Sequence, residues 1–465
     1  MGGRSSANPL KSAPQTAAYP LDRTKTNERL SHLDGLRGVA ILLVVLYHSY
    51  SRHPDVPELY TGFFGQGHYG VQLFFLLSGF LIFHSLETSG SLGSFIYRRW
   101  LRLFPAMVVA SCLILETSLF LYERPDKLPG YYDAFPGLLF IEPRLLRNWL
   151  GMKLTGPLEG AFWTLFTEIK FYLLFALAFA LWRRKAVYLL AGVALAAGTI
   201  YFLQAVGVYP VGRAPFDSAL SLSLEVNGIC YGWFAAGALL YLYYDTKHRP
   251  YLAASVFFGA VGVATNSSVA DPGGIIFCAA VYLAFAGTFF WKGLAEFLSK
   301  RGWVFFGFIS YPLYLIHENA SWAMILKIHK MIPALPDRLV PILPIAVVCT
   351  VAWAIAAYAE PLLREILDSW RKGKAQGGTL GFFRGGRANA CAILALLAAA
   401  VVGASFLPSV ATPRAKLEKE ILESERAWLQ PLEQKLSDDQ RALTETRQAR
   451  IQAEAYLASM PKPAP

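Results

Sequence analysis

LDGLRGVAILLVVLYH, residues 33–48, joins an acid, an arginine and a histidine to an apolar segment. Arg37 and His48 are eleven positions apart, close to a whole number of helical turns. A helix would therefore place both on one face, about 16 Å apart along its axis. Charged and titratable groups are costly inside a bilayer and mark function there. A histidine can also accept or donate a proton near neutral pH. The segment thus predicts a membrane helix that carries chemistry, although Arg37 alone would also suit the cytoplasmic end of a span.

The composition of the chain indicates an integral membrane protein. Of its 465 residues, 55% are hydrophobic and only 16% are charged, which is too apolar for a soluble protein of this length. Apolar runs long enough to cross a bilayer recur along the sequence. The formal net charge is +11. Because the basic residues lie scattered between the apolar runs, they are typical of cytoplasmic loops and argue against a nucleic-acid partner.

The apolar runs predict an all-α fold, a polytopic transmembrane bundle of about ten core spans followed by an eleventh span. The expected divisions are a disordered cytoplasmic tail at 1–30, a membrane domain at 31–360, a basic cytoplasmic linker at 361–387, the additional span at 388–408 and an extracytoplasmic helical tail at 409–465. The ninth span is expected over about 303–326. Basic clusters place the N-terminus in the cytoplasm by the positive-inside rule.

The predicted C-terminal tail mixes charges of both signs along two helices that are separated near Pro431. This pattern is typical of a solvated helical hairpin. The alternative is a surface for self-association or for a protein partner. The tail contains no constellation of catalytic residues.

Arg98 and Arg102 precede the third predicted span and, at four residues apart, share one face of a helix. Two guanidiniums on one face can hold phosphates through paired hydrogen bonds. The alternative is ordinary cytoplasmic charge beside a span. The pair is therefore a candidate site for a phosphate-bearing ligand.

WTLFTEIKFY, residues 163–172, places Glu168 one helical turn before Tyr172 at the start of the fourth predicted span. A carboxylate this close to the membrane is either paired or functional. Lys170 is a poor local partner for it, because residues two apart do not face each other on a helix. Glu168 is therefore a candidate for chemistry.

SYPLYLIH, residues 310–317, places Ser310, Tyr314 and His317 on one helical stripe. Pro312 interrupts the backbone hydrogen bonding and frees a carbonyl for other partners. The alternative is an aromatic helix with a capped polar end. The stripe is a second candidate for intramembrane chemistry.

GVQLFFLLSGFLI, residues 70–82, carries glycines that are typical of close helix packing. Packing is the first interpretation of this run and substrate contact the second. The remaining histidines read as structural or lie in loops and at span ends, and no pair of them has convincing metal spacing. We therefore expect no bound metal.

Taken in order along the chain, these five motifs resemble the acyltransferase-3 family of integral membrane acyltransferases, over about residues 31–360. The resemblance implies a membrane-bound enzyme that moves an acyl group, usually acetyl, from cytoplasmic acyl-CoA to hydroxyls of an exported or cell-surface glycan. It further implies a multi-pass protein of the bacterial inner membrane. Acyl-CoA would be a co-substrate, and no cofactor would be bound permanently.

The resemblance also implies roles for the residues of the motifs. Those expected to be catalytic are His48, Glu168 and His317, and those expected to bind donor or substrate are Arg37, Arg98, Arg102, Tyr172, Ser310 and Tyr314. His48 would act as general base on the acceptor hydroxyl or become transiently acylated, and the sequence leaves both open. Glu168 would orient or charge-stabilise a histidine.

The expected partners are acyl-CoA, a glycan or glycolipid acceptor, the lipid bilayer and, through 409–465, a protein partner or a second copy. Two other classes of function stay open. A transporter or exporter of a glycan or lipid-linked substrate also keeps polar groups within its spans, although no strong internal repeat is evident here. A non-catalytic scaffold would recruit partners through the tail.

Overall fold

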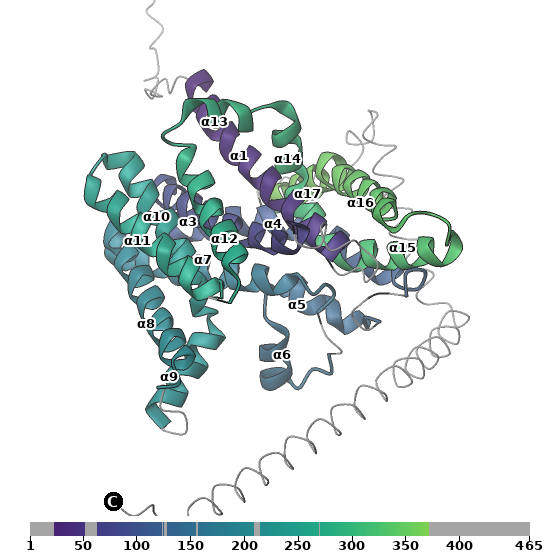
Figure 1. Ribbon diagram of the computed structural model, residues 1–465, viewed down its shortest axis with the longest axis horizontal. Helices are drawn as coiled ribbons and strands as arrows, with labels where there is room; N and C mark the ends of the chain where they lie inside the picture. Colours follow the sequence, from purple (N-terminus) through teal and green to yellow (C-terminus); the bar gives the residue numbers. More distant parts are fainter. Residues whose placement is uncertain are drawn as a thin grey trace, which may run out of the picture. The chain divides into compact units, whose positions relative to one another are not determined.

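The computed structural model describes residues 23–371, apart from 52–62, 123, 125–127, 155–156, 209–213 and 269. Within these residues every regular element is a helix and no strand is present (Figure 1), which confirms the all-α prediction. The predicted eleventh span at 388–408 and the predicted tail at 409–465 lie outside the described residues. So does most of the predicted tail at 1–30 and of the predicted linker at 361–387.

The longer helices follow the apolar runs of the sequence. They are α1 (Arg23–Leu46), α3 (Gly70–Thr88), α4 (Leu92–Thr117), α7 (Phe162–Trp182), α8 (Val187–Ala205), α10 (Tyr231–Thr246), α11 (Arg249–Asn266), α12 (Pro272–Gly287), α14 (Arg301–Ile316), α15 (Glu318–Met331) and α16 (Ile342–Ala354). α1 begins inside the segment predicted to be a disordered tail, because several residues of 23–30 are good helix formers.

Shorter helices connect or extend these. They are α5 (Ala134–Leu139), α6 (Pro143–Leu150), α9 (Ala214–Glu225), α13 (Lys292–Leu298) and α17 (Glu360–Arg371), with single turns η1 (Tyr47–Ser51), η2 (Gln66–Tyr69), η3 (Tyr131–Asp133), η4 (Arg183–Ala186), η5 (Gly228–Cys230), η6 (Asp337–Leu339) and η7 (Ile355–Ala359). α17 carries the chain into the first residues of the predicted cytoplasmic linker.

Five helical stretches among the described residues are long and apolar enough to cross a membrane. They are 31–50, 63–88, 92–117, 162–205 and 337–367. The pair α12 and α13, which is bent by 98°, is a sixth when counted as one broken span. The stretch 162–205 is about twice the length that a bilayer requires, and it is interrupted where Arg183 adopts a positive φ of 53°. The protein thus has several membrane-type helices, and a bundle of about ten spans stays a prediction.

Glycines allow the central helices to pack backbone against backbone. α1 packs against α14, and a Cβ added at Gly307 would lie 1.9 Å from the carbonyl oxygen of Asp34. α3 packs against α10 in the same way, since a Cβ at Gly79 would lie 2.2 Å from the carbonyl oxygen of Phe234 and one at Gly237 would lie 2.1 Å from that of Leu76. The packing role predicted for the 70–82 run is confirmed.

The ninth predicted span, over about 303–326, contains a break in its helix. α14 ends at Ile316 and α15 begins at Glu318, so His317 lies at the break. Pro312 has no N–H to donate and its ring disturbs the preceding turn, which weakens the helix shortly before the break. Beyond the break, the carboxylate of Glu159 accepts a hydrogen bond of 2.9 Å from the backbone N–H of Asn319, so the new helix end is satisfied locally.

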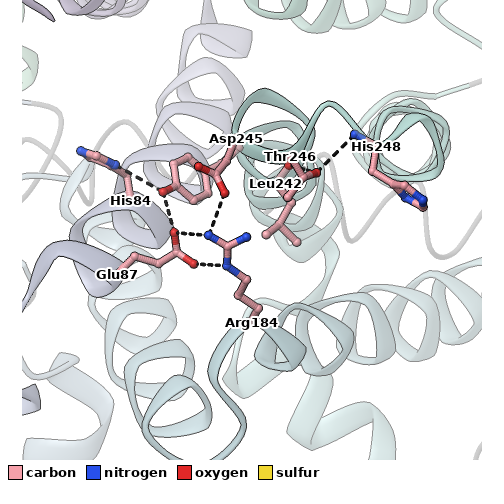
Figure 2. A network of polar contacts seen from close by, with 8 residues as sticks. His84, Glu87, Arg184, Leu242, Asp245, Thr246 and His248 are labelled. Carbon is pink, nitrogen blue, oxygen red and sulfur yellow. Dashed lines mark hydrogen bonds and ion pairs between the residues drawn. The ribbon is translucent and has the colours of Figure 1, made fainter.

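A polar network joins α3, η4 and α10 away from the pocket described below (Figure 2). Arg184 donates from Nε to Glu87 at 2.5 Å and from a terminal nitrogen to Asp245 at 2.7 Å. The hydroxyl of Tyr241 donates to Glu87 at 2.7 Å, and His84 lies 3.4 Å from the same hydroxyl. The residues from three elements therefore hold this end of the bundle together.

Candidate active site

A pocket lies between α1, α3, α4, α7 and α14. The apolar part of its wall is formed by Val71, Phe74, Phe75, Leu77, Leu81, Ile82, Leu103 and Leu165. The polar side chains that line it are Arg37, Ser78, Arg99, Arg102, Thr164, Glu168, Tyr172, Ser310, Tyr311 and Tyr314. Most of the residues predicted to bind substrate or donor are among them. Distant segments of sequence therefore converge on one cavity.

One part of the pocket carries positive charge. Arg37 of α1 meets Arg99 and Arg102 of α4 there. Arg37 donates to its neighbour Asp34 at 2.6 Å, and the guanidinium of Arg99 lies 5.7 Å from the ring centroid of Tyr172. The lining contains three guanidiniums and one carboxylate, that of Glu168. This excess of positive charge favours an anionic ligand, and the planar donors of the guanidiniums suit phosphate oxygens.

The structure brings Arg99 rather than Arg98 to this pocket. Arg98 is exposed, donates to the hydroxyl of Ser89 and is absent from the pocket lining. Arg99 and Arg102 are three residues apart, a spacing that also shares a helix face. The motif contains both pairs, Arg98 with Arg102 and Arg99 with Arg102. Only the rotation of α4 against its neighbours decides which pair faces the pocket. The backbone carbonyl of Arg102 accepts a hydrogen bond of 3.3 Å from Arg364 of α17, which also contacts Glu360.

Glu168 lies on the pocket wall between two hydroxyls. Ser78 of α3 and Tyr172 both donate hydrogen bonds to its Oε1 atom. Neither partner is a histidine, so the structure does not bear out the expectation that Glu168 orients one. Ser78 was not predicted to be a site residue. The indication in the sequence was a hydroxyl side chain between Leu77 and Gly79 in a largely apolar helix.

Lys170 faces away from Glu168 toward the α6 and α9 side of the fold. Its ammonium donates to Glu142 at 2.5 Å and to the backbone carbonyl of Glu225 at 2.5 Å. The lysine therefore ties α7 to two neighbouring elements. This explains why a charged residue follows Glu168 so closely without pairing with it.

Tyr314 connects the pocket to a pair of histidines. Its hydroxyl contacts that of Thr164 and donates to the carbonyl of Ala161 at 2.7 Å. Its ring centroid lies 5.6 Å from that of His317 and 6.1 Å from that of Phe74 on the pocket wall. Thr164 was not predicted to belong to the site, although it lies within the quoted 163–172 motif.

The rings of His48 and His317 meet edge to face, with centroids 5.0 Å apart and an interplanar angle of 71°. His48 lies in the π-helical turn η1, and such turns often occur at functional sites. His317 is 1% exposed and lies at the break between α14 and α15, where its Nδ1 is 2.9 Å from the carbonyl of Tyr314. Two irregular backbone segments thus bring together two of the three predicted catalytic residues.

A carboxylate without an assigned role lies beside this pair. Oε1 of Glu318 is 3.3 Å from Nδ1 of His48. The only sequence signal for Glu318 was its position directly after His317.

Among the described residues, no group of three or more His, Cys, Asp or Glu side chains could hold a metal ion.

The arrangement can bind an anionic ligand at one part and move a proton at another. The arginines face the pocket, the apolar wall can hold an aliphatic chain, and the imidazoles adjoin Tyr314. A buried imidazole is the usual side chain for general base catalysis on a hydroxyl, and it can also be a nucleophile. The site is therefore suited to group transfer.

The chain is similar in sequence to known acyltransferases. The model of the acyltransferase-3 family, described as an acyltransferase domain, matches residues 30–359. The peptidoglycan O-acetyltransferase OatA of Listeria monocytogenes is 31% identical over 34% of this chain and 26% of its own length. The acyltransferase MdmB of Streptomyces mycarofaciens is 30% identical over 44% of this chain and 52% of its own. Nodulation protein 10 of Rhizobium leguminosarum bv. viciae is 31% identical over 25% of this chain and 34% of its own.

The chain spans about a quarter to a half of the length of these relatives. No solved structure matches it. The family match covers well over half of the chain and confirms the resemblance carried by the five motifs. The chain belongs to the acyltransferase-3 family.

Proposed function

We propose that this protein is a membrane O-acyltransferase that moves an acyl group from acyl-CoA to a hydroxyl of an exported or cell-surface glycan. The observation that supports it most is the continuity of the site. The pocket includes Arg99 and Arg102 as well as Tyr314. The ring of Tyr314 contacts that of His317, which in turn contacts the ring of His48 edge to face. Donor binding and proton transfer therefore have a continuous set of side chains to act through.

The donor would lie with its phosphates against the arginines. Guanidiniums bind phosphate oxygens in a bidentate manner, and a nucleotide with several phosphates offers the matching charge. The apolar residues of the same lining, which include Val71, Phe74 and Leu165, suit the aliphatic arm that ends in the thioester. The thioester would then lie toward Tyr314 and the histidines.

In the proposed reaction His48 accepts the proton of the acceptor hydroxyl. The hydroxyl oxygen bonds to the thioester carbonyl carbon, the carbon–sulfur bond breaks, and the thiolate of CoA takes the proton back from the imidazolium. The products are an O-acyl ester and the CoA thiol. In the second form, the acyl group is transferred first to His48 and then to the hydroxyl.

The proposal includes an orientation. The membrane would be a bacterial inner membrane, and the positive-inside pattern supports an orientation with the N-terminus and the arginine end at its cytoplasmic face, where acyl-CoA is available. His48 then lies toward the outer side, and segment 409–465 lies outside, free to bind a partner or a second copy. The name of OatA, a peptidoglycan O-acetyltransferase, supports a glycan as acceptor.

Mass spectrometry of surface glycans tests the proposal in cells that lack the gene or carry wild-type, His48→Ala or His248→Ala protein. The wild type should add an acyl mass, supplied by isotope-labelled acyl-CoA, that His48→Ala does not restore at equal membrane abundance. His248→Ala is the matched control, because His248 is exposed between α10 and α11, and it should restore the mass. Normal acylation by His48→Ala, or transport of an unmodified substrate, would contradict the proposal.

A further inference from the structure

Glu318 is a buried carboxylate held between His48 and a backbone amide. It is the first residue of α15 and is 5% exposed. Its Oε1 lies 3.3 Å from Nδ1 of His48, and its Oε2 accepts a hydrogen bond of 2.6 Å from the N–H of Ala161. The two oxygens of one carboxylate therefore have different partners, one of them the imidazole expected to do the chemistry.

The segment before α7 encloses this carboxylate tightly. A Cβ added at Gly160 would lie 2.9 Å from Oε2 of Glu318, so only glycine leaves the side chain its present position. Asn319 donates from its backbone to Glu159 at 2.9 Å and from its side chain to the carbonyl of Leu158 at 3.1 Å. The first turn of α15 is thus fixed to residues 158–161, and the orientation of Glu318 is fixed with it.

A carboxylate beside one imidazole nitrogen decides where the proton of the neutral ring lies. It favours the proton on the nitrogen that it faces and leaves the other nitrogen as the acceptor. It also stabilises the imidazolium that forms when the ring takes a second proton. The carboxylate needs no proton of its own for either effect. In a site as closed as this one, such a charge is screened little by water.

We propose that Glu318 is the positioning residue for His48: it holds the imidazole in the form protonated on Nδ1, so that Nε2 accepts the proton of the acceptor hydroxyl. This inference rests on the proposed function of His48. The other nearby carboxylates have different partners, because Glu168 binds Ser78 and Tyr172, and Glu159 binds the amide of Asn319.

The geometry makes Glu318→Gln a sharp test. The amide of Ala161 still needs an acceptor, so the oxygen of the new side chain should stay there and its NH2 group should face His48. That group would donate to Nδ1 and force the proton of the neutral ring onto Nε2. The variant keeps the size of the side chain and should move the proton of the neutral imidazole from Nδ1 to Nε2.

The experiment measures the 15N spectrum of histidine in the full-length protein in bilayers at mildly alkaline pH, with His48 assigned by its loss in His48→Asn. Wild-type His48 should carry its proton on Nδ1, and Glu318→Gln should move it to Nε2. The rate constant for acyl transfer should fall by about 10- to 100-fold, while the KM for acyl-CoA changes little. Glu159→Gln is the matched control, because Glu159 is also a buried carboxylate and the amide oxygen of glutamine can still accept the hydrogen bond from the N–H of Asn319; it should leave the proton of His48 on Nδ1.

Each outcome decides the inference. An unchanged Nδ1–H form and rate in Glu318→Gln would overturn it. If that variant fails to fold, Glu318→Ala takes its place and should release His48 into a mixture of both forms, whereas a pure Nδ1–H form there overturns the proposal. The spectrum requires no turnover, so a wild-type protein with the expected Nδ1–H form and no acyl transfer would refute the proposed function and leave the positioning role standing.

Discussion

His48 and His317 lie ring to ring, with centroids 5.0 Å apart, although they come from opposite ends of the family-matched segment. Each is placed by an irregularity of the backbone, His48 by a π-helical turn and His317 by the break between two helices. Regular helices would have directed both side chains along fixed stripes. The irregularities bring the rings together, and the first prediction below follows from this contact.

His317→Ala should lower acyl transfer by about 10- to 100-fold, less than the loss of the base itself, for which about 10²- to 10⁴-fold is expected. Its Nδ1 lies 2.9 Å from the carbonyl of Tyr314, and this contact fixes the ring beside His48. Water that fills the space in the alanine variant would not reproduce this geometry. Initial rates with labelled acyl-CoA measure the effect. An unchanged rate would mean that the ring contact has no part in transfer.

Arg99→Ala should raise the KM for acyl-CoA by about 10- to 100-fold, the usual effect of removing a hydrogen bond to a charged group. Arg98→Ala should change it by less than about twofold, because Arg98 is exposed and bonded to Ser89 outside the pocket. Binding of a non-hydrolysable acyl-CoA analogue gives the same comparison without turnover. The opposite ranking would show that the sequence motif was right in pairing Arg98 with Arg102 and that the pocket is not the donor site.

Tyr314→Phe should destabilise the protein by about 1–3 kcal/mol, because the carbonyl of Ala161 and the hydroxyl of Thr164 lose a buried partner. The ring that contacts His317 stays in place, so the KM for acyl-CoA should change little. Thermal unfolding in detergent measures the first effect. The hydroxyl of Thr164 also donates to the carbonyl of Ala161, at 3.2 Å, so a combined Tyr314→Phe and Thr164→Val variant should be less stable than Tyr314→Phe alone. An unchanged melting temperature in both variants would contradict this network.

Gly307→Ala should separate α1 from α14 and reduce stability by about 1–3 kcal/mol or more. The added methyl group would lie 1.9 Å from the carbonyl oxygen of Asp34, where only backbone movement can make room. Gly302→Ala is the control on the same helix, because nothing lies within 4 Å of its added Cβ. Equal melting temperatures for the two variants would contradict the packing that positions Arg37 and His48.

The sequence predicted the helices and several of the residues that meet in the pocket. Periodicity put Ser310 and Tyr314 on one stripe, and both line the cavity. Glu168 was expected to be paired or functional, and two hydroxyls bind it. In these cases the information is local: the spacing along one helix fixes which side chains share a face, and an intramembrane carboxylate requires partners.

The tertiary structure decided what depends on contacts between helices. The rotation of α4 turned Arg99 rather than Arg98 to the pocket, although either has the spacing to act with Arg102. The break after Ile316 placed Glu318 beside His48, a contact that no pattern within one segment encodes. The sequence by itself therefore determined the all-α membrane class and the family. Only the packed structure determined which charges face the site, because helix rotation and backbone breaks are settled by long-range packing and not by periodicity.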